Sequence, residues 1–77
     1  MPHVVPLHLL QPGETGCVLE VEGEPLLVQR LDEMGLRAGV QVRMVTSGRP
    51  CIVALDQHRL SFRGEDEALV MVEVATP

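Results

Sequence analysis

Five side chains in the sequence could ligate a transition metal, and they are His3, His8, Cys17, Cys51 and His58. A structural zinc site usually takes paired ligands from a short motif such as Cys-x-x-Cys, and no two of these residues have that spacing. We therefore interpret the histidines as surface imidazoles, and the cysteines as small apolar residues on strands. His58 and His8 remain candidate metal ligands, and we expect no bound cofactor.

The side chains that could act as a nucleophile and a base do not form a catalytic motif. Ser47, Ser61 and the two cysteines are candidate nucleophiles, and His58 is the candidate base. A nucleophile needs a base within reach, and the base needs a group that orients it. No recognisable spacing joins these residues. The sequence therefore predicts that the chain is not an enzyme.

Two groups of residues are candidates for binding a partner protein. Leu36 and Arg37 follow an expected helix, and an exposed apolar side chain beside an arginine is a common interface composition. The alternative for Leu36 is that it closes the bottom of the core. Arg59 and Arg63 share one face of an expected strand, which could equally be an ordinary solvated face. An arginine from either group could reach a phosphate of a nucleotide bound to the partner.

Short segments of alternating polarity must position these residues. Strands are predicted at residues 15–22, 40–45, 51–55, 59–63 and 69–74, with glycine- or proline-containing turns or short polar connections between them. In the first of these strands, Cys17, Leu19 and Val21 alternate with Val18 and two glutamates, which indicates one buried face with Cys17 as a core thiol. The two ends, residues 1–6 and 75–77, are expected to be partly disordered.

One short helix is predicted at residues 25–34. Proline suits the first helical position, where its missing N–H costs nothing, and Gly35 suits the C-terminal cap. Leu27, Leu31 and Met34 recur at the spacing of one helical face, so the helix should pack this stripe on the sheet. The expected core consists of Leu27, Leu31, Met34, Val42, Leu60 and Phe62.

Composition restricts the class of function. The chain has 77 residues, a length that suits one domain (1–77, with a core over roughly residues 7–74). Eleven acidic residues outnumber six basic ones, and Phe62 is the only aromatic residue, so nucleic-acid binding and an aromatic proline-peptide groove are both disfavoured. No apolar run is long enough to span a membrane, and the N-terminus lacks a secretory signal. We therefore expect a cytoplasmic chain with reduced thiols.

Four segments in order resemble the FeoA-type domain, the small cytosolic component of bacterial ferrous iron uptake. Residues 9–16 resemble its opening Leu-x-Pro-Gly-x-x-Gly segment, and residues 30–39 resemble its Arg-Leu, Met-Gly-Leu and final Gly motif. Residues 48–50 resemble its Gly-x-Pro turn, and residues 60–63 with 67–68 resemble its closing segment. The chain departs from the family pattern at three places. The family often has proline at the position of Ala38 and a charged or polar residue at the position of Gly64, and the connection at residues 46–50 is shorter than usual.

The resemblance implies a mainly β, small SH3-like β-barrel of about five strands with one short helix. It also implies a partner, the membrane transporter FeoB with its cytosolic GTP-binding domain. The expected function is an accessory role in ferrous iron uptake through binding and regulating FeoB. The alternative is a stand-alone metal-sensing or oligomerising module, because the same domain type resembles the C-terminal domain of iron-dependent repressors. Whether the chain forms a homo-oligomer stays open.

Overall fold

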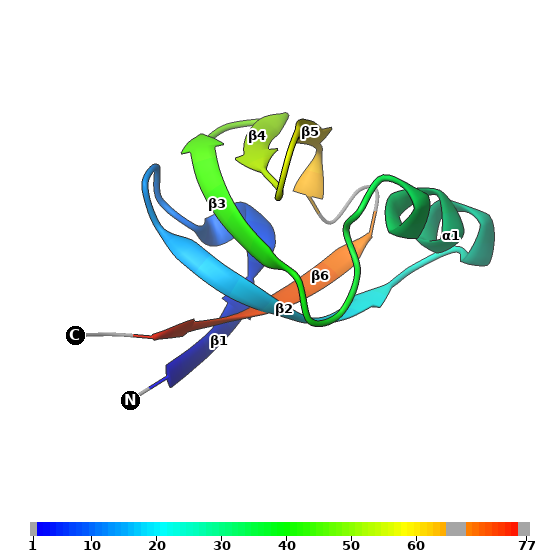
Figure 1. Cartoon of the computed structure of the whole chain (residues 1–77), viewed down its shortest axis with the longest axis horizontal. Coiled ribbons are helices and arrows are strands. Elements are labelled where there is room, and N and C mark those ends of the chain that lie inside the picture. The colour runs from blue at the N-terminus through cyan, green and yellow to red at the C-terminus, as the bar shows by residue number, and fades with distance from the viewer. Residues whose placement is uncertain (1, 65–67, 76–77) are drawn as a thin grey trace.

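A computed structural model of the protein describes residues 2–64 and 68–75. Six antiparallel strands form one curved sheet in the order β1-β6-β2-β3-β4-β5 (Figure 1). The elements are β1 (Pro2–Pro6), the 3-10 turn η1 (Leu7–Leu9), β2 (Thr15–Glu22), α1 (Pro25–Glu33), β3 (Gln41–Thr46), β4 (Cys51–Ala54), β5 (Arg59–Phe62) and β6 (Leu69–Ala75). The prediction of a mainly β domain with one short helix is confirmed.

The sheet has one strand more than the sequence predicted. Of the N-terminal segment expected to be partly disordered, Pro2–Pro6 forms β1, which pairs with β6 along its whole length. Prolines at both ends of β1 suit a strand at the end of a sheet, because proline cannot donate to a ladder. Among the described residues, the pairings leave β1 and β5 as the two ends, so the sheet curls like a barrel without a ladder closing it.

The core lies inside the curve of this sheet. Leu31, Val42, Leu60 and Phe62 are buried, as predicted. Leu27 and Met34 are half-buried and pack against the core from the side of α1. The residues that complete the buried cluster are Leu7, Leu10, Val18, Leu36, Met44, Cys51, Val53, Ala68, Val70 and Val72.

The predicted buried face of β2 is wrong at Cys17 and Leu19, whereas Val21 is half-buried and packs against the core, as predicted. Val18 is buried, whereas Cys17 is half-buried and Leu19 is 43% exposed. The reason is a bulge against β6, where the register shifts between Val18 and Glu20, so that strict alternation does not hold along the strand. Gly16 fits closely here, because a Cβ at this position would lie 3.2 Å from the Val72 Cβ.

The helix α1 begins at Pro25, as predicted, and ends within one residue of the predicted boundary. Its end is a Schellman motif: the Gly35 N–H donates to the Asp32 carbonyl at 2.9 Å, and the Leu36 N–H donates to the Leu31 carbonyl at 2.9 Å. Gly35 has φ +99°, a conformation that favours glycine. Within the described part of the chain, no helix combines the length and apolar character needed to cross a membrane.

Candidate partner-binding groove

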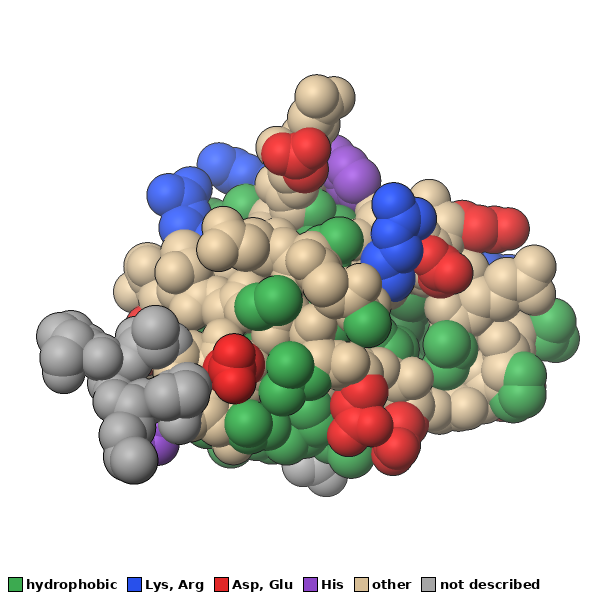
Figure 2. All heavy atoms as spheres, turned by 60° about the horizontal axis from the view of Figure 1, so that its bottom comes forward, with side chains coloured by type: hydrophobic (Ala, Val, Ile, Leu, Met, Phe, Trp, Pro, Cys, Tyr) green, Lys and Arg blue, Asp and Glu red, His purple; other side chains and the backbone are tan. Residues whose placement is uncertain are grey.

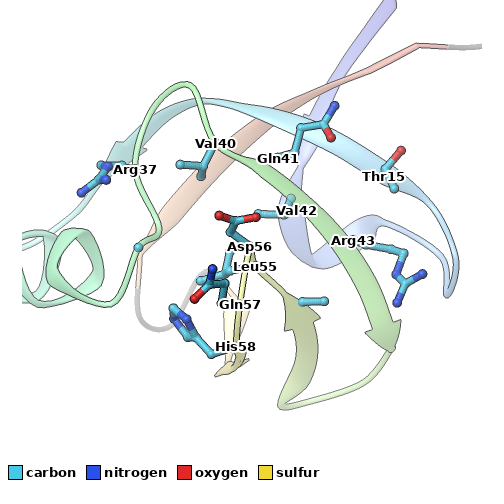
Figure 3. A pocket seen from close by; sticks show the side chains of 12 residues that line it. Thr15, Arg37, Val40, Gln41, Val42, Arg43, Leu55, Asp56, Gln57 and His58 are labelled. Atoms are coloured by element: carbon cyan, nitrogen blue, oxygen red, sulfur yellow. The ribbon is translucent and has the colours of Figure 1, made fainter.

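A groove of about 690 Å³ opens between the end of α1, the start of β3 and the connection from β4 to β5 (Figure 3). Its walls are residues 40–43 of the β3 side and residues 54–58 of the β4–β5 side, with Thr15, Gly35 and Arg37 completing the rim. We call this feature the β3 groove. Its size falls in the range of surface clefts that bind ligands or peptide segments.

The groove exists because β4 is shorter than β3. Ala54 at the end of β4 pairs with Arg43, whereas β3 begins two residues earlier, at Gln41. After Ala54 the chain turns into β5, and the Leu55 N–H donates to the His58 carbonyl at 2.8 Å to close the connection. The first residues of β3 therefore have β2 on one side and an opening on the other.

His58 fixes the β4–β5 connection to the helix. Its Nε2 donates a hydrogen bond to the carbonyl oxygen of Met34, the C-cap residue of α1. The last carbonyls of a helix lack partners within the helix, so this bond satisfies one of them. The His58 ring also lies beside Gly35, where a Cβ would be 3.4 Å from its Cε1. In Figure 3, His58 lies on the same side of the groove as Gln57. One ring nitrogen of this candidate metal ligand is therefore engaged in the fold.

The charged side chains at the groove are mainly basic, whereas the net charge of the whole chain is negative. Arg37 and Arg43 lie toward opposite ends, and Asp56 lies between them (Figure 3). The Nη1 atom of Arg37 is 3.4 Å from Oδ1 of Asp32, but both side chains are more than half exposed, so this ion pair contributes little. Two arginines and one carboxylate thus line the groove of a chain whose net charge is −5.

The structure places Leu36 in the core, with 0% of its surface exposed. The prediction that Leu36 projects outward to bind a partner is therefore wrong. The physical reason is the Schellman motif, which turns Leu36 back toward Leu31, a residue that is also buried. Arg37, the next residue, is exposed at the rim of the β3 groove.

The other predicted site residues do not line this groove. Arg59 and Arg63 are exposed on β5 and just after it. His8 is half-buried in η1, and a Cβ at Gly64 would lie 3.3 Å from its Cγ. The structure therefore brings Arg37 and His58 to one groove and places Arg59, Arg63 and His8 elsewhere. The sequence reasoning missed Gln41, Arg43 and Asp56, which show no local motif.

The two cysteines differ in burial, since Cys17 is half-buried and Cys51 is buried. Cys51 is a buried thiol whose Sγ donates to the Phe62 carbonyl at 3.3 Å, as expected for a core cysteine. Over residues 2–64 and 68–75, no group of three or more His, Cys, Asp or Glu side chains gathers in a way that could hold a metal ion. His8 and His58 stay candidate ligands by prediction.

The large exposed apolar side chains lie outside the set of residues that line the β3 groove. Val4, Leu9, Leu19, Leu26 and Ile52 are the large ones among the described residues. Figure 2 shows one face of the molecule, on which apolar side chains occur in several groups with acidic side chains beside them. Exposed apolar residues of this kind are normal on small soluble domains. The β3 groove is therefore the candidate site.

A family model described as the FeoA domain matches residues 5–74 of the chain. The chain belongs to the FeoA domain family. This family of small accessory proteins is associated with ferrous iron transport, and both the resemblance in sequence and the SH3-like fold are confirmed. A search of curated proteins gives no match to this FeoA-family chain.

Two solved FeoA structures resemble the chain over most of its length. An iron uptake regulatory protein (FeoA) is 29% identical, with a TM-score of 0.83, and the match covers 94% of this chain and 100% of that one. A FeoA from Stenotrophomonas maltophilia in complex with zinc is 27% identical, with a TM-score of 0.76, and 88% of each chain is covered. That protein is described as a prokaryotic SH3-domain protein and a candidate activating factor of ferrous iron transport.

Two repressors share the fold of this FeoA-family chain. A manganese-dependent transcriptional repressor is 16% identical, with a TM-score of 0.82, and the match covers 97% of this chain and 44% of the repressor. IdeR from T. acidophilum is 17% identical, with a TM-score of 0.77 and coverage of 94% and 34%. At this identity the likeness is one of fold.

Proposed function

We propose that the protein is a non-catalytic, cytoplasmic accessory protein of ferrous iron uptake that binds the cytosolic part of the transporter FeoB. Family membership supports the iron-uptake context. The observation that carries the binding role is the β3 groove, which exposes Arg37 and Arg43 on a chain whose net charge is −5. A charge of opposite sign on a partner steers association and fixes which face is used.

The groove is built to keep its shape during binding. Its first wall is the start of the β3 strand, which packs into the core through Val42. Its second wall is tied to the end of α1 by the bond from His58 to Met34. A recess with rigid walls binds with a smaller loss of conformational freedom than a loop that must first become ordered. Binding of FeoB in this groove would regulate the transporter. No cofactor would be needed for this role.

The test is calorimetric titration of this chain with the purified cytosolic GTP-binding domain of FeoB. We expect binding by the wild type, and a loss of affinity of about tenfold or more for the R37E/R43E variant. The matched control is R59E/R63E, which makes the same change of charge on and after β5. Binding that survives R37E/R43E but not R59E/R63E would place the interface on β5, and no binding by the wild type would overturn the proposal.

One observation favours a second function, metal binding with oligomerisation. The S. maltophilia FeoA was crystallised in complex with zinc. In the present chain, the candidate ligands are His58 and His8, of which His58 uses Nε2 for the bond to Met34. Sedimentation of the chain with and without zinc tests this function. A zinc-dependent change of mass that His58→Ala or His8→Ala abolishes would support it, and an unchanged mass would contradict it.

A further inference from the structure

We propose that the β3 groove binds an extended segment of the partner, which adds to the free edge of β3 at Gln41 as a short strand and places acidic side chains toward Arg37 and Arg43. This inference rests on the proposed function and specifies how the partner is recognised. It commits to strand addition, a mode in which main-chain hydrogen bonds supply affinity and side chains supply specificity.

The backbone N–H and C=O groups along β3 alternate in direction from one residue to the next. The Val18 N–H donates to the Val40 carbonyl at 2.9 Å, and the Met44 N–H donates to the Glu14 carbonyl at 2.9 Å. The Gly13 N–H also donates to the Met44 carbonyl at 2.8 Å, and Val42 lies opposite Gly16, so Val42 and Met44 of β3 direct their backbone groups toward β2 and the turn before it. In an antiparallel strand these directions alternate, so the backbone groups of Gln41 and Arg43 point the other way, toward β4.

The neighbouring strand β4 pairs with Arg43 but does not extend as far as Gln41. Arg43 pairs with Ala54, the last residue of β4. The same register would place Asp56 opposite Gln41, but Asp56 belongs to the connection that turns into β5. No backbone hydrogen bond crosses from Gln41 to the described residues of that connection. Gln41 thus presents one N–H and one C=O to the groove, as an edge strand presents them to an incoming strand.

The outer edge of β5 also presents outward backbone groups at Ser61, but Ser61 does not line the β3 groove, and the outer edge of β1 is poorly suited to an added strand. The outer edge of β1 carries Pro2 and Pro6, and proline provides no N–H for an added strand. The proline-helix mode of SH3 ligands needs an aromatic groove, and the single aromatic side chain, Phe62, is 1% exposed in the core. An ordinary extended segment with its own N–H groups is therefore the occupant that the groove suits.

The charges specify the sequence of that segment. Gln41 and Arg43 lie two residues apart on the same face of β3, so a side chain of an added strand near Gln41 would be a diagonal neighbour of Arg43. Arg37 lies at the other end of the groove and Asp56 between the two arginines (Figure 3). A segment that fits this order has a carboxylate near each end and an uncharged residue between them.

The test uses hydrogen exchange measured by NMR on the full chain, alone and saturated with the cytosolic domain of FeoB. We expect the Gln41 amide to exchange at least about tenfold more slowly in the complex, because it becomes a donor in a ladder. The Ser61 amide is the internal control, since the register of β4 with β5 directs it outward on the opposite edge. Protection of Ser61 in place of Gln41 would overturn the inference.

Variants give a second measurement. Gln41→Pro removes an N–H that the free chain leaves unpaired, and it should weaken binding by about tenfold or more while the fold persists. Ser61→Pro is the matched control and should bind like the wild type. A cross-linking residue at position 41 should attach to a FeoB peptide rich in Asp or Glu. If the wild type binds FeoB but the Gln41 amide is not protected, strand addition is contradicted and the proposed function is not. If the wild type does not bind FeoB, both are contradicted.

Discussion

His58 donates a hydrogen bond from Nε2 to the carbonyl oxygen of Met34, and this bond joins the β4–β5 connection to the end of α1. The two residues are 24 positions apart in the chain. One wall of the β3 groove is therefore held by a bond to the end of α1 in addition to the pairing of Ala54 with Arg43. The shape of the groove depends on this bond, which gives the first prediction.

Replacing His58 by Ala should lower the free energy of unfolding by about 1 kcal/mol, because one side-chain hydrogen bond is lost at an exposed site. The variant should also bind the FeoB domain less tightly, since the connection at residues 55–58 is released from α1. Urea denaturation and calorimetry measure the two effects. The control is His3→Ala at an exposed position on β1, which should change neither quantity. Equal behaviour of both variants would contradict a positioning role for His58.

Leu36 and Arg37 are adjacent in sequence, but substitution of Leu36 should affect stability, whereas substitution of Arg37 should affect binding. Leu36→Ala should cost about 2 to 5 kcal/mol of stability, because it empties a fully buried site. Arg37→Ala should change stability by no more than about 0.5 kcal/mol and should weaken binding instead. Denaturation of both variants with the same probe is the measurement. A Leu36→Ala protein as stable as the wild type would show that this residue does not close the core.

Gly35→Ala should destabilise the domain more than Gly13→Ala does. Both glycines have positive φ, +99° and +93°, so each substitution pays about 1 to 3 kcal/mol for the backbone conformation. At Gly35 the added methyl group would also lie 3.4 Å from Cε1 of His58, at the short limit of ordinary van der Waals contact and beside the bond from His58 to Met34, whereas Gly13 has open space around it. Thermal melts of the two variants give the comparison. A larger loss at Gly13 would contradict the contact between Gly35 and His58.

Phe62→Ala should cost about 3 to 5 kcal/mol, because Phe62 is the largest fully buried side chain of the core. A domain of this size has a stability of about the same magnitude, so the variant should be largely unfolded at room temperature. Circular dichroism checks this expectation. The matched control is Leu26→Ala on the exposed side of α1, where 73% of the side chain is in solvent.

The parts of the fold that depend on local sequence could be predicted. The start at Pro25, the end at Gly35 and the burial of Leu31 follow from proline at the first helical position, a glycine cap and an apolar stripe. The burial of Leu36 also had a local signal, because an apolar residue directly after a glycine cap often contacts the last turn of its helix. The sequence interpretation left that alternative open, and the structure decides it.

The remaining features depend on contacts between distant segments. β1 forms because β6 offers it an edge, and nothing within residues 2–6 reports this. The bulge that exposes Leu19 comes from the register of β2 with β6. The β3 groove depends on where β4 stops relative to Gln41 and Arg43. The local periodicity of a single sequence does not show which residues pair between neighbouring strands.

The most direct test of the central claim is an NMR titration of the labelled chain with the cytosolic domain of FeoB, following every assigned backbone amide. We predict that the largest chemical-shift changes occur at residues 40–43 and 54–58, the walls of the β3 groove. These changes should diminish as salt is added, because salt screens exposed charges. Changes confined to β5 around Arg59 and Arg63, or no change at any ratio of the two proteins, would contradict the claim.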